Sequence, residues 1–197
     1  MTTLLPPDLQ QTLADRPVCI HASMRSFNPR IAPDTLLDAL LALGCTVLAP
    51  TFTYALEQPA PEAGAPARNG MDYTRAPPEH DRRYDPAENE LSVADMGALP
   101  EALLRRERTR GEHPLNSFAA VGPRAEELIR RQSPQTVYGP LEALIEAGGL
   151  VVLAGVGCTS MTLIHLAEQR AGRRLFQRWA LDRHGHRIAC ATGSCSA

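Results

Sequence analysis

Short apolar runs rich in β-branched residues alternate along the chain with longer segments in which leucine and alanine recur at helical spacing. The short runs predict buried strands, at PVCIHAS (17–23), CTVLAPTFT (45–53), SFAAVG (117–122) and LVVLAGVG (150–157). The longer segments predict helices, at residues 7–14, 32–44, 98–107, 123–131, 140–149 and 159–168. This alternation predicts an α/β domain in which helices pack on a sheet.

The order strand, helix, strand over residues 17–53 is typical of a βαβ unit, whose two strands run parallel. Near the end of the chain, FQRWALD (176–182) and RIACAT (187–192) predict a hairpin around the turn from Asp182 to His186. A hairpin is antiparallel, so we expect a mixed sheet. A length of 197 residues suits a single domain over residues 1–197.

Residues 55–96 break the regular pattern, with six prolines and few aliphatic residues. Within this insert, residues 57–95 hold nine acids and four arginines, a net charge of −5, whereas the rest of the chain carries +3. A long irregular segment in a compact domain is usually either functional or disordered. The insert therefore predicts either a binding surface for a polycation or a solvated, mobile loop.

In contrast to the acidic insert, the segment LLRRERTRGEHP (103–114) is rich in arginine, at positions 105, 106, 108 and 110. Guanidinium groups bind phosphates through two parallel hydrogen bonds, so the cluster is a candidate phosphate site. The alternative is a basic helix end that complements the helix dipole.

Bulk properties argue against several classes of partner. A net charge of −2 gives no general attraction to nucleic acid or an anionic membrane, and no apolar run reaches the length of a membrane span. The N-terminus lacks the features of a signal peptide. Five cysteines without a CxxC pair predict reduced thiols in a cytoplasmic protein, with Cys158 as a small buried thiol. The chain has no lysine, so no lysine Schiff base can form.

His165 and Glu168 stand three residues apart in an otherwise apolar predicted helix, TSMTLIHLAE (159–168), and so share one helical face. A carboxylate on one ring nitrogen fixes the tautomer, which leaves the other nitrogen to act as a general base. The preceding strand, 150–157, would place the pair at the carboxyl edge of the sheet, where open α/β sheets bind ligands. A buried structural histidine is the alternative. No HExxH spacing or third ligand accompanies the pair, so we expect no metal.

Several of these segments together resemble the aminoglycoside 3-N-acetyltransferase family, also called the antibiotic N-acetyltransferase family. The matching segments occur in the family's order, at HASMRSF (21–27), LAPTFTY (48–54), YDP (84–86), MGALPE (96–101), HPLNSFAAVG (113–122) and GVGCTSMTLIHLAE (155–168). The resemblance implies a three-layer α/β/α fold with a central mixed, largely parallel sheet. It also implies transfer of acetyl from acetyl-CoA, the co-substrate, to the 3-amino group of an aminoglycoside or a similar polycationic amine.

The resemblance assigns roles to particular residues. The general base and its carboxylate partner fall on His165 and Glu168, and no covalent enzyme intermediate is needed. Cofactor-binding positions fall on Ser23, Met24, Arg25, Ser26, Ser117 and Phe118, to which the arginine cluster adds Arg110. The charge of the insert, rather than the resemblance, makes Asp72, Glu88 and Asp95 acceptor-binding candidates. Thr53 and Tyr54, at the carboxyl end of a predicted strand, are candidates for the same pocket.

Two departures from the family pattern stand out. FNPRIAP (27–33) occupies the place of a glycine-rich turn, and the chain stops at ATGSCSA, where family chains usually continue. An oxyanion-stabilising hydroxyl would then come from Thr192 or Ser194. The alternatives are an acetyltransferase for a biosynthetic amine, or a shortened CoA-binding protein without turnover. We expect a monomer or a homodimer.

Overall fold

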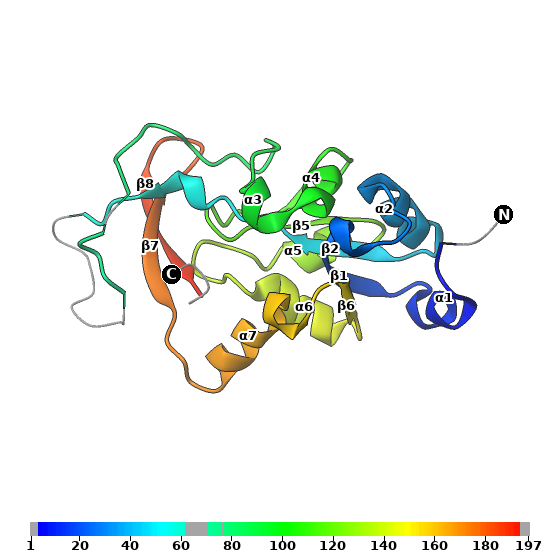
Figure 1. The fold of residues 1–197 in the computed structure, drawn as a ribbon. Helices are drawn as coiled ribbons and strands as arrows, with labels where there is room; N and C mark the ends of the chain where they lie inside the picture. The colour runs from blue at the N-terminus through cyan, green and yellow to red at the C-terminus, as the bar shows by residue number, and fades with distance from the viewer. Residues whose placement is uncertain (1–3, 62–70, 76, 194–197) are drawn as a thin grey trace.

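The protein is described here by a computed structural model that covers residues 4–61, 71–75 and 77–193. Its described part contains a central five-stranded sheet and a smaller three-stranded sheet. In Figure 1 the small sheet stands at one end of the molecule and the N-terminal helix at the other. The predicted mixed sheet is confirmed.

The central sheet has the order β4-β5-β2-β1-β6. Its strands are β1 (Pro17–Ala22), β2 (Thr46–Pro50), β4 (Thr109–Arg110), β5 (Phe118–Val121) and β6 (Leu150–Ala154). β1 pairs in parallel with both β2 and β6, with Val18 opposite Val47 on one side and Leu150 on the other. β5 is antiparallel to β2 and to β4. The carboxyl ends of β1, β2 and β6 therefore meet at one edge of the sheet.

Helices cover both faces of this sheet. On one face, α1 (Pro7–Leu13), α2 (Pro33–Ala42) and α4 (Ala98–Leu104) bury their apolar sides against β1, β2 and β5. On the other, α5 (Ala125–Ile129), α6 (Gly139–Glu146) and α7 (Leu163–Arg170) pack on the opposite sides of the same strands. Figure 1 shows α2 and α4 on one side of the strands and α6 and α7 on the other. This is the expected α/β/α arrangement of layers.

The α2 segment illustrates how the sequence builds these elements. Pro33 begins the helix at a position where its missing N–H costs little, and Leu36, Leu37 and Leu40 form its buried side. The chain then turns at Gly44, whose φ of +75° suits a residue without a Cβ. A Cβ there would lie too close to Oδ1 of Asp15, so that carboxylate would have to move.

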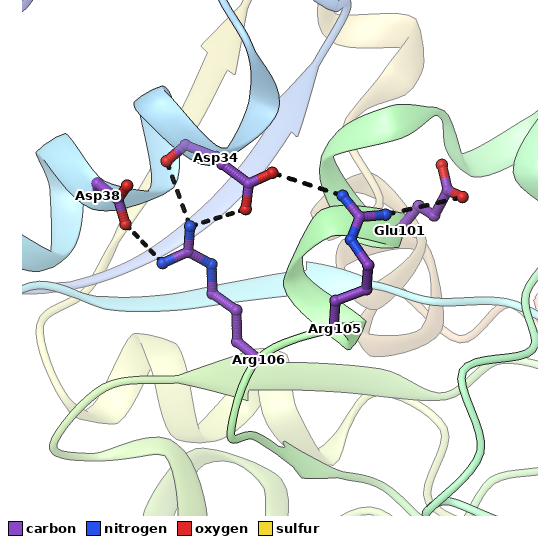
Figure 2. Close-up of polar contacts among 5 residues, drawn as sticks. All are labelled: Asp34, Asp38, Glu101, Arg105 and Arg106. Atoms are coloured by element: carbon purple, nitrogen blue, oxygen red, sulfur yellow. Dashed lines mark hydrogen bonds and ion pairs between the residues drawn. The ribbon is translucent and has the colours of Figure 1, made fainter.

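Ion pairs join the exposed sides of α2 and α4, and Figure 2 shows them. Arg106 donates to Asp38 at 2.6 Å and to Asp34 at 2.8 Å, and Arg105 lies between Asp34 and Glu101. Two members of the predicted arginine cluster are therefore paired with carboxylates of the protein. The alternative interpretation was a basic helix end, and both arginines do lie just beyond the last residue of α4. Their partners, however, are side chains of α2 and α4.

The small sheet has the order β3-β7-β8, formed by β3 (Glu57–Gln58), β7 (Phe176–Leu181) and β8 (Arg187–Thr192). β7 and β8 form the predicted hairpin, with Phe176 opposite Thr192. Asp182 shapes its turn by accepting hydrogen bonds from the backbone N–H groups of His184 and His186, each 2.9 Å long. The hairpin is confirmed, but it belongs to a separate sheet that the sequence pattern did not distinguish.

Much of the insert packs against the rest of the protein. It begins with a 3₁₀ turn, Tyr54–Leu56, that leads into β3, and it ends with a short helix, α3 (Val93–Met96). Tyr84 is buried, and its hydroxyl donates to the carbonyl of Gly111 at 2.6 Å. Glu57 is paired with Arg178 of β7 at 2.5 Å, and both side chains are largely buried. Residues 62–70 and 76 lie outside the described part of the chain.

Candidate active site

The predicted catalytic helix begins later than its sequence suggested. After β6 the chain turns at Gly155, forms a 3₁₀ turn at Cys158–Ser160, and enters α7 at Leu163. Thr162 occupies the N-cap position without a side-chain cap, so the expected helix start at residue 159 was wrong. The 3₁₀ turn holds residues 158–161 through its own backbone hydrogen bonds. His165 consequently lies in the first turn of α7.

His165 and Glu168 form the predicted pair. Nδ1 of His165 lies 2.8 Å from Oε2 of Glu168, and Arg173 donates to the other carboxylate oxygen. The His165 hydrogen bond, together with Arg173, holds the pKa of Glu168 below its ordinary value despite partial desolvation. The carboxylate is therefore ionised near neutral pH, and its hydrogen bond with Nδ1 of His165 orients the ring.

The imidazole is not sealed in the interior. The side chain of His165 is 18 % exposed and lines a cavity of about 250 Å³. The cavity lies between α7, α3 and the loop before β5, and its walls include Tyr54, Asp95, Asn116 and Tyr138. A pair of this kind, open to a cavity, can accept a proton from a bound nucleophile.

A second cavity of about 210 Å³ adjoins the first at the carboxyl ends of β1 and β2. His21, Ala22, Pro50 and Val156 line the second cavity but not the first. The two cavities share walls formed by residues 52, 95, 96, 160 and 162. The site thus lies at the edge of the sheet where ligands of α/β proteins are expected.

The first group of predicted cofactor residues forms a 3₁₀ turn, Met24–Ser26, directly after β1. The hydroxyl of Ser26 donates to the carbonyl of Gly155 at 2.9 Å, which joins this turn to the one after β6. Met24 packs against the core and Arg25 is exposed. None of the four residues from Ser23 to Ser26 lines the two cavities, but the neighbouring Ala22 does.

The second group is buried. Ser117 and Phe118 have no exposed surface, and the hydroxyl of Ser117 donates to the carbonyl of Thr51 at 2.8 Å. Arg110 is 7 % exposed, with its guanidinium bonded to Ser117 and to the carbonyls of residues 51, 88 and 90. These contacts occupy four of its five donors, so Arg110 fastens the insert to the sheet. We therefore leave these three residues out of the proposed cofactor site.

Two of the five acceptor-binding candidates line a cavity beside His165, and the other three line neither cavity. Tyr54 and Asp95 line the cavity with His165, and Asp95 lines its neighbour as well. Thr53 is buried, and its hydroxyl bonds to the carbonyl of Pro114. Asp72 and Glu88 are exposed and line neither cavity, and Asp72 instead accepts hydrogen bonds from Thr74.

The structure describes Thr192, one of the two oxyanion candidates. Thr192 is buried at the end of β8 and lines neither cavity, and Ser194 lies outside the described residues. The neighbour of Thr192, Gly193, does line the His165 cavity, and a Cβ there would collide with the hydroxyl of Tyr138. Cys158 is exposed, so its prediction as a buried thiol was wrong.

Sequence reasoning missed His21, Asn116, Tyr138 and Gly193 as cavity residues. His21 and Asn116 lie within the HASMRSF and HPLNS segments, but such segments do not reveal which side chain turns toward a cavity. Burial lowers the pKa of His21 to about 4, so its ring is neutral at physiological pH. Tyr138 belongs to no motif singled out, and Gly193 stands between the two oxyanion candidates, so only the fold shows that both line the His165 cavity.

Within the described residues, no group of three or more histidine, cysteine or acidic side chains is arranged to hold a metal ion. The same part of the chain contains no helix with the length and hydrophobicity that crossing a membrane requires.

Comparison with known proteins identifies the family. A family model described as aminoglycoside 3-N-acetyltransferase matches residues 19–192. The chain belongs to this family. The match includes most of β1, the insert, the HPLNS segment and both members of the His165–Glu168 pair. The fold thus belongs to an aminoglycoside 3-N-acetyltransferase-type domain.

Individual acetyltransferases are also similar to this chain in sequence or in fold. The chain is 43 % identical over 113 residues to aminoglycoside N(3)-acetyltransferase IX of Micromonospora chalcea, a match that covers 54 % of this chain and 38 % of that protein. The structure of AAC-IIIb with CoASH is 25 % identical, with a TM-score of 0.71, and the match covers 94 % of this chain and 76 % of that one.

A variant of aminoglycoside acetyltransferase AAC(3)-IVa in complex with a gentamicin is 26 % identical, with a TM-score of 0.65. This match covers 93 % of the chain and 66 % of that structure. The chain spans only 38 % of the Micromonospora protein, well under two thirds of its length.

Proposed function

We propose that this protein is an acetyl-CoA-dependent N-acetyltransferase that acetylates the 3-amino group of aminoglycosides. The observation that carries the proposal is the His165–Glu168 hydrogen bond, placed beside a cavity that Asp95 also lines. Family membership supports acetyl transfer, and the geometry supplies a base where an amine can bind.

In the proposed reaction, His165 accepts a proton as the amine nitrogen attacks the carbonyl carbon of the thioester. Glu168 stabilises the imidazolium that forms, while Arg173 holds the carboxylate from its other side. A new C–N bond replaces the C–S bond, and the departing sulfur takes a proton to leave as CoA thiol. The products are an amide and CoA, with no covalent enzyme intermediate.

The acceptor amine occupies the cavity lined by His165 in this proposal. The carboxylate of Asp95 attracts a polycation there, and Tyr54 forms part of the same wall. Asp95 is exposed and has no ion pair in the described part of the chain, so its charge is available to a ligand. The gentamicin complex of a related acetyltransferase supports this class of acceptor.

In this proposal acetyl-CoA enters through the second cavity, and its thioester reaches the wall that the two cavities share. That cavity begins where β1 and β6 end, next to the turns at Met24–Ser26 and Cys158–Ser160. We therefore keep residues 23–26 in the proposed cofactor site, as the turn that flanks its entrance. The CoASH complex of AAC-IIIb supports CoA as the cofactor.

The proposal is tested by measuring thiol release from acetyl-CoA with a panel of amines. The panel contains gentamicin, sisomicin, apramycin and simple diamines, and mass spectrometry counts the acetyl groups added. We expect one acetyl group on the aminoglycosides, at the 3-amino nitrogen by NMR, and much slower turnover of the diamines.

Other results point to the alternatives. Turnover of simple amines but not of aminoglycosides would favour a biosynthetic acceptor. A CoA-dependent rise in melting temperature without thiol release from any amine would show a CoA-binding protein and overturn the proposed reaction.

A further inference from the structure

The loop before β5 is held rigidly beside the His165 cavity. His113 is fully buried, and its Nδ1 accepts hydrogen bonds from the backbone N–H groups of Leu115 at 3.2 Å and Asn116 at 2.9 Å. Its Nε2 donates to the carbonyl of Ala191 on β8 at 2.8 Å. Gln132 completes the frame by donating to the carbonyl of Asn116 at 3.0 Å. The backbone of Asn116 is thereby fixed from two sides.

The side chain of Asn116, in contrast, lacks a protein partner for its oxygen. Asn116 is 7 % exposed, and its Oδ1 is buried without a hydrogen bond to any described residue. A buried acceptor left unpaired costs free energy on the order of 1–3 kcal/mol, so such groups are rare unless something else satisfies them. Among the residues with such an atom in the described part of the chain, Asn116 is the one that lines the His165 cavity.

We propose that Asn116 is a specificity-determining residue, whose carboxamide oxygen accepts a hydrogen bond from an ammonium or hydroxyl group of the acceptor amine. The inference rests on the proposed function for the reaction that the amine undergoes. Asn116 lines the cavity with His165 but not the neighbouring one, so it faces the acceptor rather than the cofactor. An aminoglycoside carries many N–H and O–H donors, among them several ammonium groups.

The rigid frame gives this contact its selectivity. Because His113 and Gln132 fix the backbone of Asn116, the carboxamide oxygen reaches a ligand only by rotation about its own side-chain bonds. A site that presents a fixed, otherwise unpaired polar group rejects ligands that cannot pair with it. Asn116 thus favours amines with a second donor near the reacting nitrogen, as in a polyamino sugar, over simple alkylamines.

The test compares Asn116→Leu with Asn116→Asp, using gentamicin and acetyl-CoA. Leucine has a similar size but no acceptor, so we expect KM for gentamicin to rise about tenfold while KM for acetyl-CoA stays within about twofold. Aspartate keeps the acceptor oxygens, so its KM for gentamicin should be close to that of the wild type or lower. Asn89→Leu, in the exposed insert away from both cavities, is the matched control and should leave both KM values unchanged.

A second readout separates this inference from the proposed reaction. The rise in melting temperature caused by gentamicin alone should shrink in Asn116→Leu and persist in Asn116→Asp, even if the wild type releases no thiol. The inference is overturned if Asn116→Leu binds the amine like the wild type. It is equally overturned if aspartate is as poor as leucine, because Asn116 would then act as a donor.

Discussion

At the scale of single residues, the site depends on which buried polar groups are paired within the protein and which are left for a ligand. Ser117 and Arg110 have their hydrogen bonds met by neighbouring residues, although their motif or charge made them candidates for cofactor binding. Asn116, next to Ser117, has an unpaired oxygen among the residues that the structure describes. The sequence indicated the HPLNS segment, but it could not show which of its side chains faces the cavity.

Two buried histidines give the protein a pH-dependent stability. Burial lowers the pKa of His21 and His113 to about 4 each, from an ordinary value of 6.5. Between these values the unfolded chain binds protons that the folded protein does not, so stability is lost as the pH falls. We expect the free energy of unfolding to fall by about 2 kcal/mol per histidine between pH 7 and pH 4.5, measured by chemical denaturation.

Variants separate this effect from the titration of carboxylates. His113→Gln should reduce the slope of stability against pH, whereas His184→Gln, in the exposed hairpin turn, should leave it unchanged. A stability that is constant or rises as the pH falls from 7 to 4.5 would contradict the assignment of neutral buried rings.

At the scale of elements, hydrophobic spacing predicted the parts that depend on burial and missed those that depend on local backbone geometry. The four predicted strands and the hairpin are present, because their apolar residues are what the core buries. The start of α7 was misplaced because a 3₁₀ turn, Cys158–Ser160, precedes it and has no distinct pattern. The antiparallel direction of β5 depends on the path of the insert, which carries no periodicity.

The α2–α4 contact shows which interaction holds two elements together. Leu103 of α4 is completely buried. Arg105, in contrast, is half exposed and forms a solvent-exposed ion pair with Asp34. We expect Leu103→Ala to lower the free energy of unfolding by about 2–5 kcal/mol. Arg105→Gln should leave it nearly unchanged, because water and salt screen an exposed pair. Chemical denaturation of both variants decides this, and a larger loss for Arg105→Gln would refute it.

At the scale of the whole molecule, the site forms where separate parts of the chain meet. The central sheet supplies the edge, α7 supplies the base, and the insert with its leading turn supplies Tyr54 and Asp95. The end of β8 adds Gly193 from the small sheet. The sequence predicted the pair on α7 because its spacing is local. Tyr138 and Gly193 could not be predicted, because only the fold brings them to His165.

The central claim is that His165, held by Glu168, accepts a proton from an amine beside a bound thioester. Its most direct test is the rate of thiol release from acetyl-CoA and gentamicin by the His165→Ala variant and the wild type, with CoA affinity measured in parallel. We predict that kcat falls by at least ~10²-fold, the usual scale for a general base, while CoA affinity is retained. A variant that turns over as fast as the wild type would contradict the account.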